Sequence, residues 1–101
     1  GLTMDIIKSI RIWVRNRSIH TAHPRDQYLK VVEEVGELAA ALARANMELI
    51  KDSIGDIVVT LVSLCETMDI DFNECVRGAY DEIKDRKGKL VDGVFIKEVA
   101  E

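Results

Sequence analysis

Apolar residues recur along most of the chain at the three- and four-residue spacing of an amphipathic helix, and this spacing predicts four helices. The first is expected over residues 3–16. The second is expected from Pro24 to about Ala45, because proline suits the first position of a helix. Each presents an apolar stripe that we expect in the core: Ile6, Ile10 and Trp13 in the first helix, and Tyr28, Val32, Val35, Ala39 and Leu42 in the second.

The third helix is expected from a cap at Asn46 to about Met68, and its middle, residues 57–64, is apolar almost all round. One neighbouring helix cannot cover such a surface, so we expect several helices around it, which a second subunit can help to supply. Asp71 and Glu74 have the spacing of a capping box and predict a fourth helix that ends near Gly88. Its expected core stripe is Phe72, Val76, Ala79 and Ile83.

The C-terminal tail, residues 90–101, is not assigned to an element, although Asp92-Gly93 indicates a turn before a short apolar piece. One proline and six glycines in 101 residues leave little room for hairpin turns. The predicted fold class is therefore all-α: a four-helix bundle in a single domain over residues 1–101, completed by dimerisation. Residues 1–4 are expected to be a tag remnant or a flexible start, because Gly1 opens the chain without Met.

Composition and charge narrow the classes of function. Hydrophobic residues make up 48% and charged residues 32%, which is typical of a soluble globular domain. The net charge of −4 disfavours a nucleic-acid partner, since duplex-binding domains carry a basic excess. No apolar run is long enough for a membrane span, and Asp5 and Lys8 interrupt the first apolar stretch, so neither a signal peptide nor a membrane partner is expected. Cys65 and Cys75 form no CxxC pair and are interpreted as reduced, buried cysteines of a cytoplasmic protein.

Acidic side chains border the core faces of the second and third predicted helices. Glu34 and Glu37 lie one turn apart on the second helix, and Asp56 stands among apolar residues of the third, one turn after Asp52. If the two helices form an antiparallel hairpin about Asn46, Glu37 and Asp56 lie about 14 Å and about 15 Å from the turn at 1.5 Å per residue. Three or four carboxylates can then converge at one level.

Like charges at such a separation repel, and a hard divalent cation removes the conflict because it prefers oxygen ligands. The pattern therefore favours a site for Mg²⁺, with Mn²⁺ as a substitute. The alternative is a solvated acidic face with ordinary ion pairs, such as Lys30 with Glu33 or Glu34. A di-iron bundle is disfavoured, because it needs Glu-x-x-His pairs and both histidines, His20 and His23, fall in a loop.

The segments Glu33-Glu34-Val35-Gly36-Glu37-Leu38 (EEVGEL) and Gly55-Asp56-Ile57-Val58 (GDIV) together resemble the MazG-like all-α nucleoside triphosphate pyrophosphohydrolases, whose pattern is EExxE, a spacer and ExxD. Gln27, Lys30 and Trp13 also match the family. The resemblance covers about residues 6–88 and is greatest to short single-domain members from phages and Gram-positive bacteria, which share a tail like residues 84–89 followed by 92–95. The chain departs from the pattern at Ser53, where the family has Glu; Asp52 is the adjacent acid.

This resemblance implies Mg²⁺-dependent hydrolysis of (deoxy)nucleoside triphosphates between the α- and β-phosphates, by a water whose pKa the cation lowers. It implies that Glu34, Glu37 and Asp56 are metal ligands, with Asp52 as a fourth, and that Glu33 orients the water or acts as general base. The phosphates would be held by Lys30, Lys84 and Lys87, with Arg86 behind them, and Trp13 and Gln27 would contribute to substrate binding. A homodimer or a dimer of dimers is expected.

One alternative stays open at this stage. The chain can be a non-catalytic helical dimer that binds a nucleotide or a protein partner, with an active site degraded at Ser53. Release of pyrophosphate separates the two interpretations.

Overall fold

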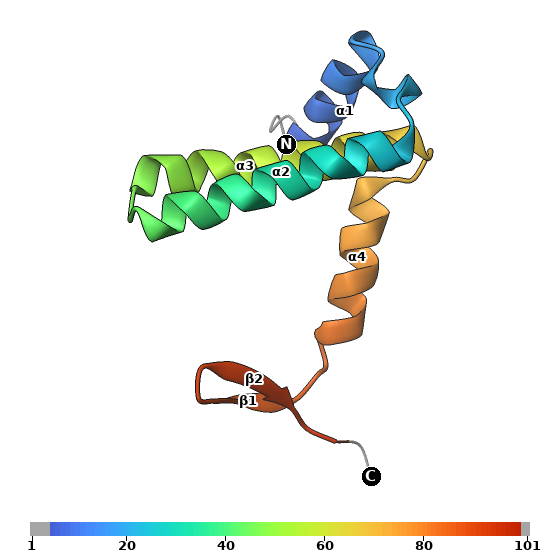
Figure 1. The fold of residues 1–101 in the computed structure, drawn as a ribbon. Coiled ribbons are helices and arrows are strands. Elements are labelled where there is room, and N and C mark those ends of the chain that lie inside the picture. The colour runs from blue at the N-terminus through green and yellow to red at the C-terminus, as the bar shows by residue number, and fades with distance from the viewer. Residues whose placement is uncertain (1–4, 100–101) are drawn as a thin grey trace.

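The computed structural model describes residues 5–99, and most of this chain is helical (Figure 1). The expectation for residues 1–4 lies outside the described part. The elements, in order, are α1 (Ile6–Asn16), the short 3₁₀ helix η1 (Ile19–Thr21), α2 (Pro24–Ala43), α3 (Met47–Thr67), α4 (Phe72–Ile83), β1 (Gly88–Val91) and β2 (Val94–Lys97). The prediction of an all-α fold with four helices is confirmed. Within residues 5–99 no helix combines the length and the apolar character that crossing a bilayer requires.

Polar side chains cap the starts of α3 and α4, as the sequence predicted. Asn46 accepts a hydrogen bond from the backbone N–H of Leu49 at 3.2 Å, and Asp71 accepts one from Asn73 at 2.8 Å. Pro24 opens α2 after His23, which serves as the N-cap. The fourth helix ends at Ile83, earlier than predicted, because the chain beyond it turns into a strand that begins at Gly88.

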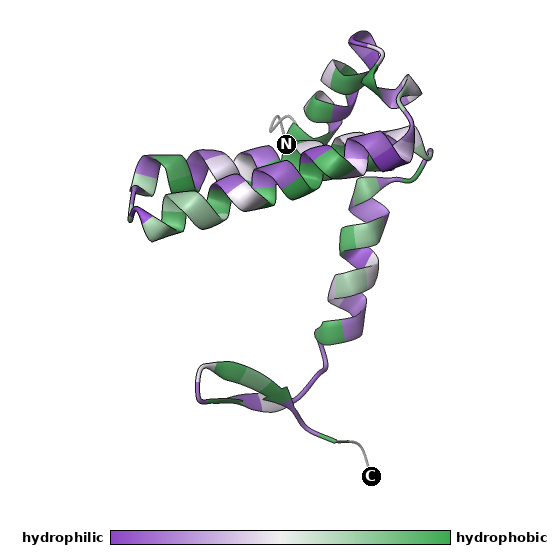
Figure 2. Cartoon of the chain, in the orientation of Figure 1, coloured by the Kyte–Doolittle hydropathy of each residue, from purple (hydrophilic) through white to green (hydrophobic). Residues whose placement is uncertain are grey.

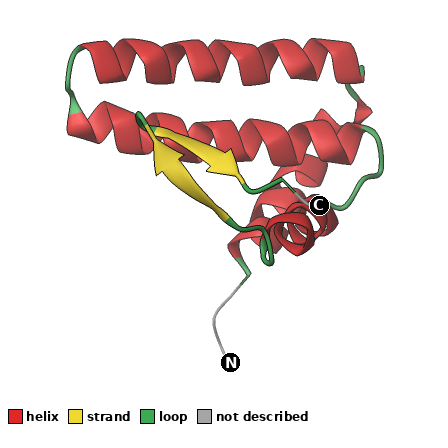
Figure 3. Ribbon diagram, turned by 90° about the horizontal axis from the view of Figure 1, so that it is seen from below, coloured by secondary structure: helices red, strands yellow, loops and turns green. Residues whose placement is uncertain are grey.

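The helices form an open assembly rather than a closed bundle (Figures 1 and 3). The two long helices α2 and α3 lie side by side and antiparallel, α1 covers one side of this pair, and α4 leaves from the other side. The radius of gyration is 16.6 Å, whereas a compact chain of this length has about 13 Å. The central helix α3 contacts α1, η1, α2 and α4, as its largely apolar middle predicted.

The core of the single chain is small, and the predicted core stripe of α2 lies outside it. Within residues 5–99 the buried hydrophobic residues are few and are spread over three helices: Val14 on α1, Val31 and Ala41 on α2, and Val62 on α3. The side of α2 that faces α3 follows Gln27, Val31, Glu34, Leu38 and Ala41. The adjacent stripe that we expected in the core is exposed in the chain: Tyr28, Val32, Val35, Ala39 and Leu42.

The same correction applies to α1 and α4. On α1 the inner side is formed by Val14 with Ile7 and Ile10, whereas Ile6 is 67% exposed and Trp13 43%. On α4 only Phe72 is partly covered, and Val76 and Ile83 are exposed. Figure 2 shows hydrophobic stretches, in green, along α4. Periodicity located the apolar stripes correctly, but a stripe is buried only when another element reaches it.

The C-terminal tail forms an antiparallel β-hairpin, which the sequence reading did not assign. The strands pair Gly88 with Lys97 and Val91 with Val94, and Asp92 and Gly93 make the turn with φ of 50° and 79°. Two central residues with positive φ are typical of the tight turn that suits the strand twist. The ring of Phe95 lies over Gly88: a Cβ built on Gly88 would stand 2.5 Å from the ring Cζ and 2.4 Å from the carbonyl oxygen of Ile96. This first position of the strand therefore requires glycine.

Candidate functional site

The pairing of α2 with α3 brings acidic residues of both helices together. Glu34 is half-buried beside α3, and its Oε2 atom is fully buried with no hydrogen-bond partner. Burial raises the pKa of Glu34, and the neighbouring charges of Glu37, Asp56 and Glu33 raise it further. Glu37 and Asp56 are therefore near enough to influence the ionisation of Glu34, while convergence of the three carboxylates on one cation stays a prediction.

An ordinary surface ion pair does not account for Glu34. The one cation nearby on α2, Lys30, places its Nζ atom 3.4 Å from Oε2 of Glu33, one turn along the exposed side. Both side chains of this pair are more than half exposed, and such pairs contribute little to stability. The alternative of a solvated acidic face thus describes Glu33 and Lys30 but leaves the buried oxygen of Glu34 unexplained.

Ser53 and Asp52 lie in different surroundings. Ser53 stands where the family pattern has Glu, and Asp52 is the adjacent acid. Ser53 is buried, with 6% of its surface exposed, whereas Asp52 is exposed. Ser53 thus occupies the inner position one turn before Asp56. Asp52 is not among the charges that raise the pKa of Glu34. It lines a cavity together with Asp56.

This cavity, of about 760 Å³, lies between α1 and α3. Its α1 wall is apolar, and its α3 wall carries both carboxylates; the lining residues are Ile6, Ile7 and Ile10 with Lys51, Asp52, Gly55, Asp56, Val58 and Val59. An apolar wall opposite charged groups suits a ligand that has an uncharged ring at one end and ionic groups at the other.

A buried ion cluster, which the sequence analysis missed, holds α1 over this cavity. Glu66 of α3 is only 3% exposed and accepts hydrogen bonds from two arginines of α1: Nε of Arg11 at 3.2 Å and Nε of Arg15 at 2.8 Å. Arg15 also reaches Asp69 at 3.0 Å, and these hydrogen bonds, first to Glu66 and then to Asp69, raise the pKa of Arg15. A carboxylate can remain charged in a buried position only when it is paired in this way. The sequence features that indicate this cluster are Glu66, an acid near the end of an apolar helix, and Arg11 and Arg15, which lie one turn apart on the first helix.

The predicted substrate-binding residues are distributed over distant parts of the chain. Trp13 is partly exposed on α1 with the Arg17 guanidinium 4.4 Å from its ring centroid, and Gln27 is buried on the side of α2 that faces α3. Lys84 is 3.6 Å from Asp81 on its own turn of chain, and Lys87 lies between α4 and the hairpin. Within residues 5–99 no ion pair joins either lysine to α2 or α3. In the described part of the chain, the basic residues 84–89 thus form no ion pair with the carboxylates of α2 and α3.

The cysteines also differ from expectation, since Cys65 is half-buried and Cys75 is exposed. Burial and, after it, the adjacent Cys75 raise the pKa of the Cys65 thiol to about 11. The start of α4 therefore lies against the end of α3.

The acidic residues fit a divalent cation in their chemistry. All the donor atoms are carboxylate oxygens, and one of them is buried without a hydrogen-bond partner. Their negative charges repel one another. No group of three His, Cys, Asp or Glu side chains between residues 5 and 99 is gathered closely enough to hold a metal ion. Glu37 and Asp56 are exposed, so a coordination sphere that includes Glu34 requires these side chains to move.

Comparison with known proteins bears on the same region. The sequence model of the MazG nucleotide pyrophosphohydrolase domain matches residues 24–91. This range includes the candidate carboxylates of α2 and α3 and the basic residues 84–89. The chain is also 39% identical over 68 residues to an uncharacterized 18.2 kDa protein from the rep-hol intergenic region of Haemophilus phage HP1. That match covers 66% of this chain and 42% of the phage protein, so the chain spans well under half of its relative's length. No solved structure matches the chain.

Proposed function

This chain belongs to the MazG nucleotide pyrophosphohydrolase family, and we propose that it hydrolyses nucleoside or deoxynucleoside triphosphates to the monophosphate and pyrophosphate with Mg²⁺ as cofactor. The observation that carries the proposal is the buried, unpartnered Oε2 atom of Glu34, which faces the charges of Glu37 and Asp56. A group in this environment is costly unless a cation or a proton compensates it.

We propose that Glu34, Glu37 and Asp56 hold the cation, with Asp52 as a fourth ligand from the cavity wall, and that Mn²⁺ can replace Mg²⁺. When bound, the cation offsets the charge of the triphosphate and lowers the pKa of the attacking water. The water oxygen bonds to the α-phosphorus, the bond from that phosphorus to the α–β bridging oxygen breaks, and pyrophosphate leaves. Glu33, on the exposed side of α2, takes the proton of the water as general base.

The cavity between α1 and α3 gives the substrate its place. The isoleucines of α1 offer an apolar wall for the nucleobase, while Asp52 and Asp56, two of the proposed metal ligands, line the opposite wall. Trp13 follows Ile6 and Ile10 on α1 at helical spacing and extends this apolar surface. The proposed cations that hold the phosphates are Lys30, Lys84 and Lys87. Gln27 contributes to substrate binding from its buried position on the side of α2 that faces α3.

The test is release of pyrophosphate from a panel of nucleoside and deoxynucleoside triphosphates with Mg²⁺. We expect Glu37→Gln or Asp56→Asn to reduce turnover at least about 100-fold, because each removes a charge that the cation requires, while the far-ultraviolet circular dichroism stays that of the native chain. Glu48→Gln is the matched control, since Glu48 is exposed in the first turn of α3, and it should leave turnover unchanged. Saturable nucleotide binding without pyrophosphate release would favour the non-catalytic module instead, and would point to Ser53 as the reason.

A further inference from the structure

We propose that the basic flank of α1, which comprises Lys8, Arg11 and Arg15, is a second ligand site that binds a phosphate group, either as free phosphate or as a phosphate monoester. The flank lies on the other side of α1 from the cavity between α1 and α3. Lys8 is turned by about 160° from both Ile6 and Ile10, which line that cavity. The site is independent of the proposed pyrophosphohydrolase activity.

The basic flank borders an open hollow of about 300 Å³ between α1 and the end of α3. Its lining joins the three cations to an amide, an apolar side chain and a buried carboxylate: Lys8, Arg11, Arg15, Asn16, Ile12 and Glu66. This volume is at the lower end of the range for small-molecule sites. The hollow therefore has room for a small anion.

The positive charge of the basic flank is not balanced within α1. The helix contains no acidic residue from Ile6 to Asn16, and the three cations follow one another at spacings of three and four residues. Such spacing places them on one face of the helix, where like charges repel one another. The chain as a whole has a net charge of −4, so this flank is a local basic surface on an acidic protein.

Glu66 orients the two arginines without using all of their donors. It accepts hydrogen bonds from the Nε atoms of Arg11 and Arg15, and Nη2 of Arg15 donates to Asp69. A guanidinium group has five N–H donors. Among the described residues, no further hydrogen bond uses the Nη atoms of Arg11 or Nη1 of Arg15, and Lys8 forms no ion pair. The ion cluster thus leaves oriented donors beside the hollow.

These groups match the chemistry of a phosphate. Guanidinium groups bind phosphate oxygens in pairs, and the ammonium group of a lysine adds a point charge. The three cations of the site face two carboxylates, those of Glu66 and Asp69, so one positive charge is uncompensated. A phosphate monoester carries a charge of about −1.5 to −2 near pH 7 and offers three acceptor oxygens. Ile12, the apolar residue of the lining, can contact the organic part of an ester.

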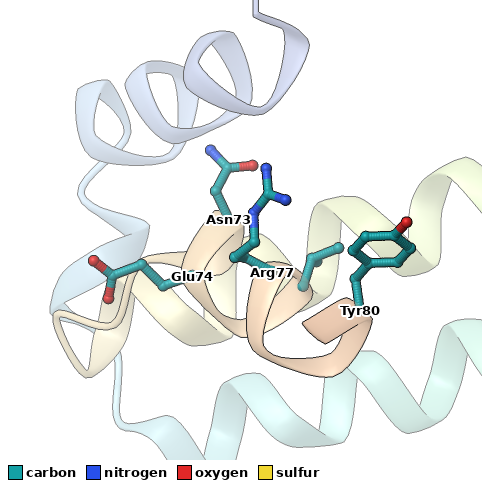
Figure 4. Close-up of a pocket in the computed structure, with 5 residues that line it drawn as sticks. Asn73, Glu74, Arg77 and Tyr80 are labelled. Carbon is teal, nitrogen blue, oxygen red and sulfur yellow. The ribbon is translucent and has the colours of Figure 1, made fainter. Parts of the chain in front are cut away.

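Two hollows formed by α4 and by the hairpin differ from this site. Figure 4 shows Asn73 and Arg77 together on the hollow along α4, of about 700 Å³, while Glu74 points away. Arg77 is the one cation in this lining, and Glu74 balances its charge. A hollow of about 420 Å³ beside the hairpin has three lysines and one acid in its lining: Lys87, Lys89, Lys97 and Glu98. Within residues 5–99 these lysines form no ion pair that would orient them, so the hairpin hollow is the competing position for a phosphate.

Isothermal titration calorimetry of the full-length chain with inorganic phosphate, at low ionic strength and in EDTA, tests the site. We expect saturable binding of one phosphate per chain with a Kd below about 1 mM, and weaker binding as salt screens the charges. A deoxynucleoside monophosphate and the matching nucleoside form two further arms. Tighter binding of the monophosphate than of free phosphate identifies an ester as the ligand, and equal binding identifies the phosphate group alone. No saturable binding of phosphate up to about 10 mM, or a nucleoside that binds as tightly as its monophosphate, would overturn the proposal.

Substitutions decide where the phosphate binds. Lys8→Glu should raise the Kd at least about tenfold, because it replaces an attractive charge by a repulsive one, whereas Lys8→Arg should leave the Kd within about threefold. The matched controls are Arg77→Gln on the hollow along α4 and the double substitution Lys89→Gln with Lys97→Gln on the hairpin hollow, and both should bind phosphate like the wild type. A larger loss of binding in the hairpin variant than in Lys8→Glu would place the phosphate beside the hairpin and overturn the proposal.

A second measurement maps the phosphate without a change of sequence. Backbone amide resonances followed during the titration should shift for residues 8–16 and not for residues 87–98. Lys8 is exposed, so we expect the circular dichroism of Lys8→Glu to show the helical content of the wild type. Shifts confined to residues 87–98 would contradict a site on α1. Because neither measurement involves turnover, a chain that releases no pyrophosphate can still confirm this site.

Discussion

The body of the molecule, α1 to α3, and the arm, residues 72–97 with α4 and the hairpin, differ in how far their residues are buried. The body buries polar groups and satisfies most of them, as Glu66 does with its two arginines. Every residue of the arm except Phe72 is exposed. The arm nevertheless has regular elements, because Asp71 caps the start of α4 and Asp92-Gly93 forms the turn of the hairpin. Local signals are enough to form an element, but only contacts with a distant surface fix where that element lies.

The largest effect on stability should come from breaking the ion cluster of the body. Replacing both Arg11 and Arg15 by Met leaves Glu66 buried and unpaired, and we expect the free energy of unfolding to fall by about 3 kcal/mol. Urea unfolding followed by circular dichroism measures this.

Replacing the exposed Arg25 and Arg77 by Met is the matched control and should change stability by less than about 0.5 kcal/mol. Equal losses in the two double variants would mean that the cluster does not hold α1 in place.

A smaller and more local effect is expected in the arm from Gly88→Ala. The added methyl group would collide with the backbone of Ile96 and the ring of Phe95, so the hairpin should lose about 1 to 2 kcal/mol while the body stays folded. Backbone amide exchange, read separately for residues 88–97 and for α3, resolves the two regions.

Gly78→Ala on α4 meets no atom within 4 Å and serves as the comparison. It should stabilise α4 by about 0.5 to 1 kcal/mol, because alanine is the better helix former. A loss of protection throughout α3 in the Gly88→Ala variant would contradict the independence of body and arm.

The smallest stability effect is expected at Glu34 and depends on pH. Burial and the charges of Glu37 and Asp56 raise its pKa in the folded state above the ordinary 4.5. The folded chain then binds the proton of Glu34 more tightly than the unfolded chain does. The contribution of Glu34 to stability is therefore fully present below pH 4.5 and is lost as pH rises through the raised pKa. Glu34→Gln, which does not titrate, should remove this part of the decline and raise the melting temperature near pH 7 in EDTA.

Addition of Mg²⁺ reverses the comparison, since a ligand that binds only the folded state stabilises it. Wild-type protein should gain melting temperature with Mg²⁺ near neutral pH, and the Glu34→Gln variant should gain much less. Thermal scans from pH 4.5 to 8, with and without Mg²⁺, measure both effects. Identical pH profiles of the two proteins in EDTA would show that Glu34 is not in the environment described.

Much of the site was predictable from the sequence because it depends on helical geometry. The rise per residue placed Glu37 and Asp56 at one level, and both lie near enough to Glu34 to raise its pKa. Helix starts at Pro24, Asn46 and Asp71 were equally predictable, since each depends on a single side chain next to the backbone it caps. The hairpin was not predicted, because its signal is a single Asp92-Gly93 turn in a chain that has few glycines and an otherwise helical pattern.

Which of two neighbouring apolar stripes faces the core could not be derived from periodicity. On α2 the stripes through Val31 and Val32 have the same spacing and lie about 100° apart, and only the position of α3 decides that the first is buried. The partners of Glu66 likewise come from a helix more than 50 residues away. The sequence alone therefore determined the helices, their caps and the acidic chemistry of α2 and α3, since these depend on residues within a few turns of one another. The tertiary structure decided which faces are covered and which charges meet, because burial and pairing depend on elements that are close in space but distant along the chain.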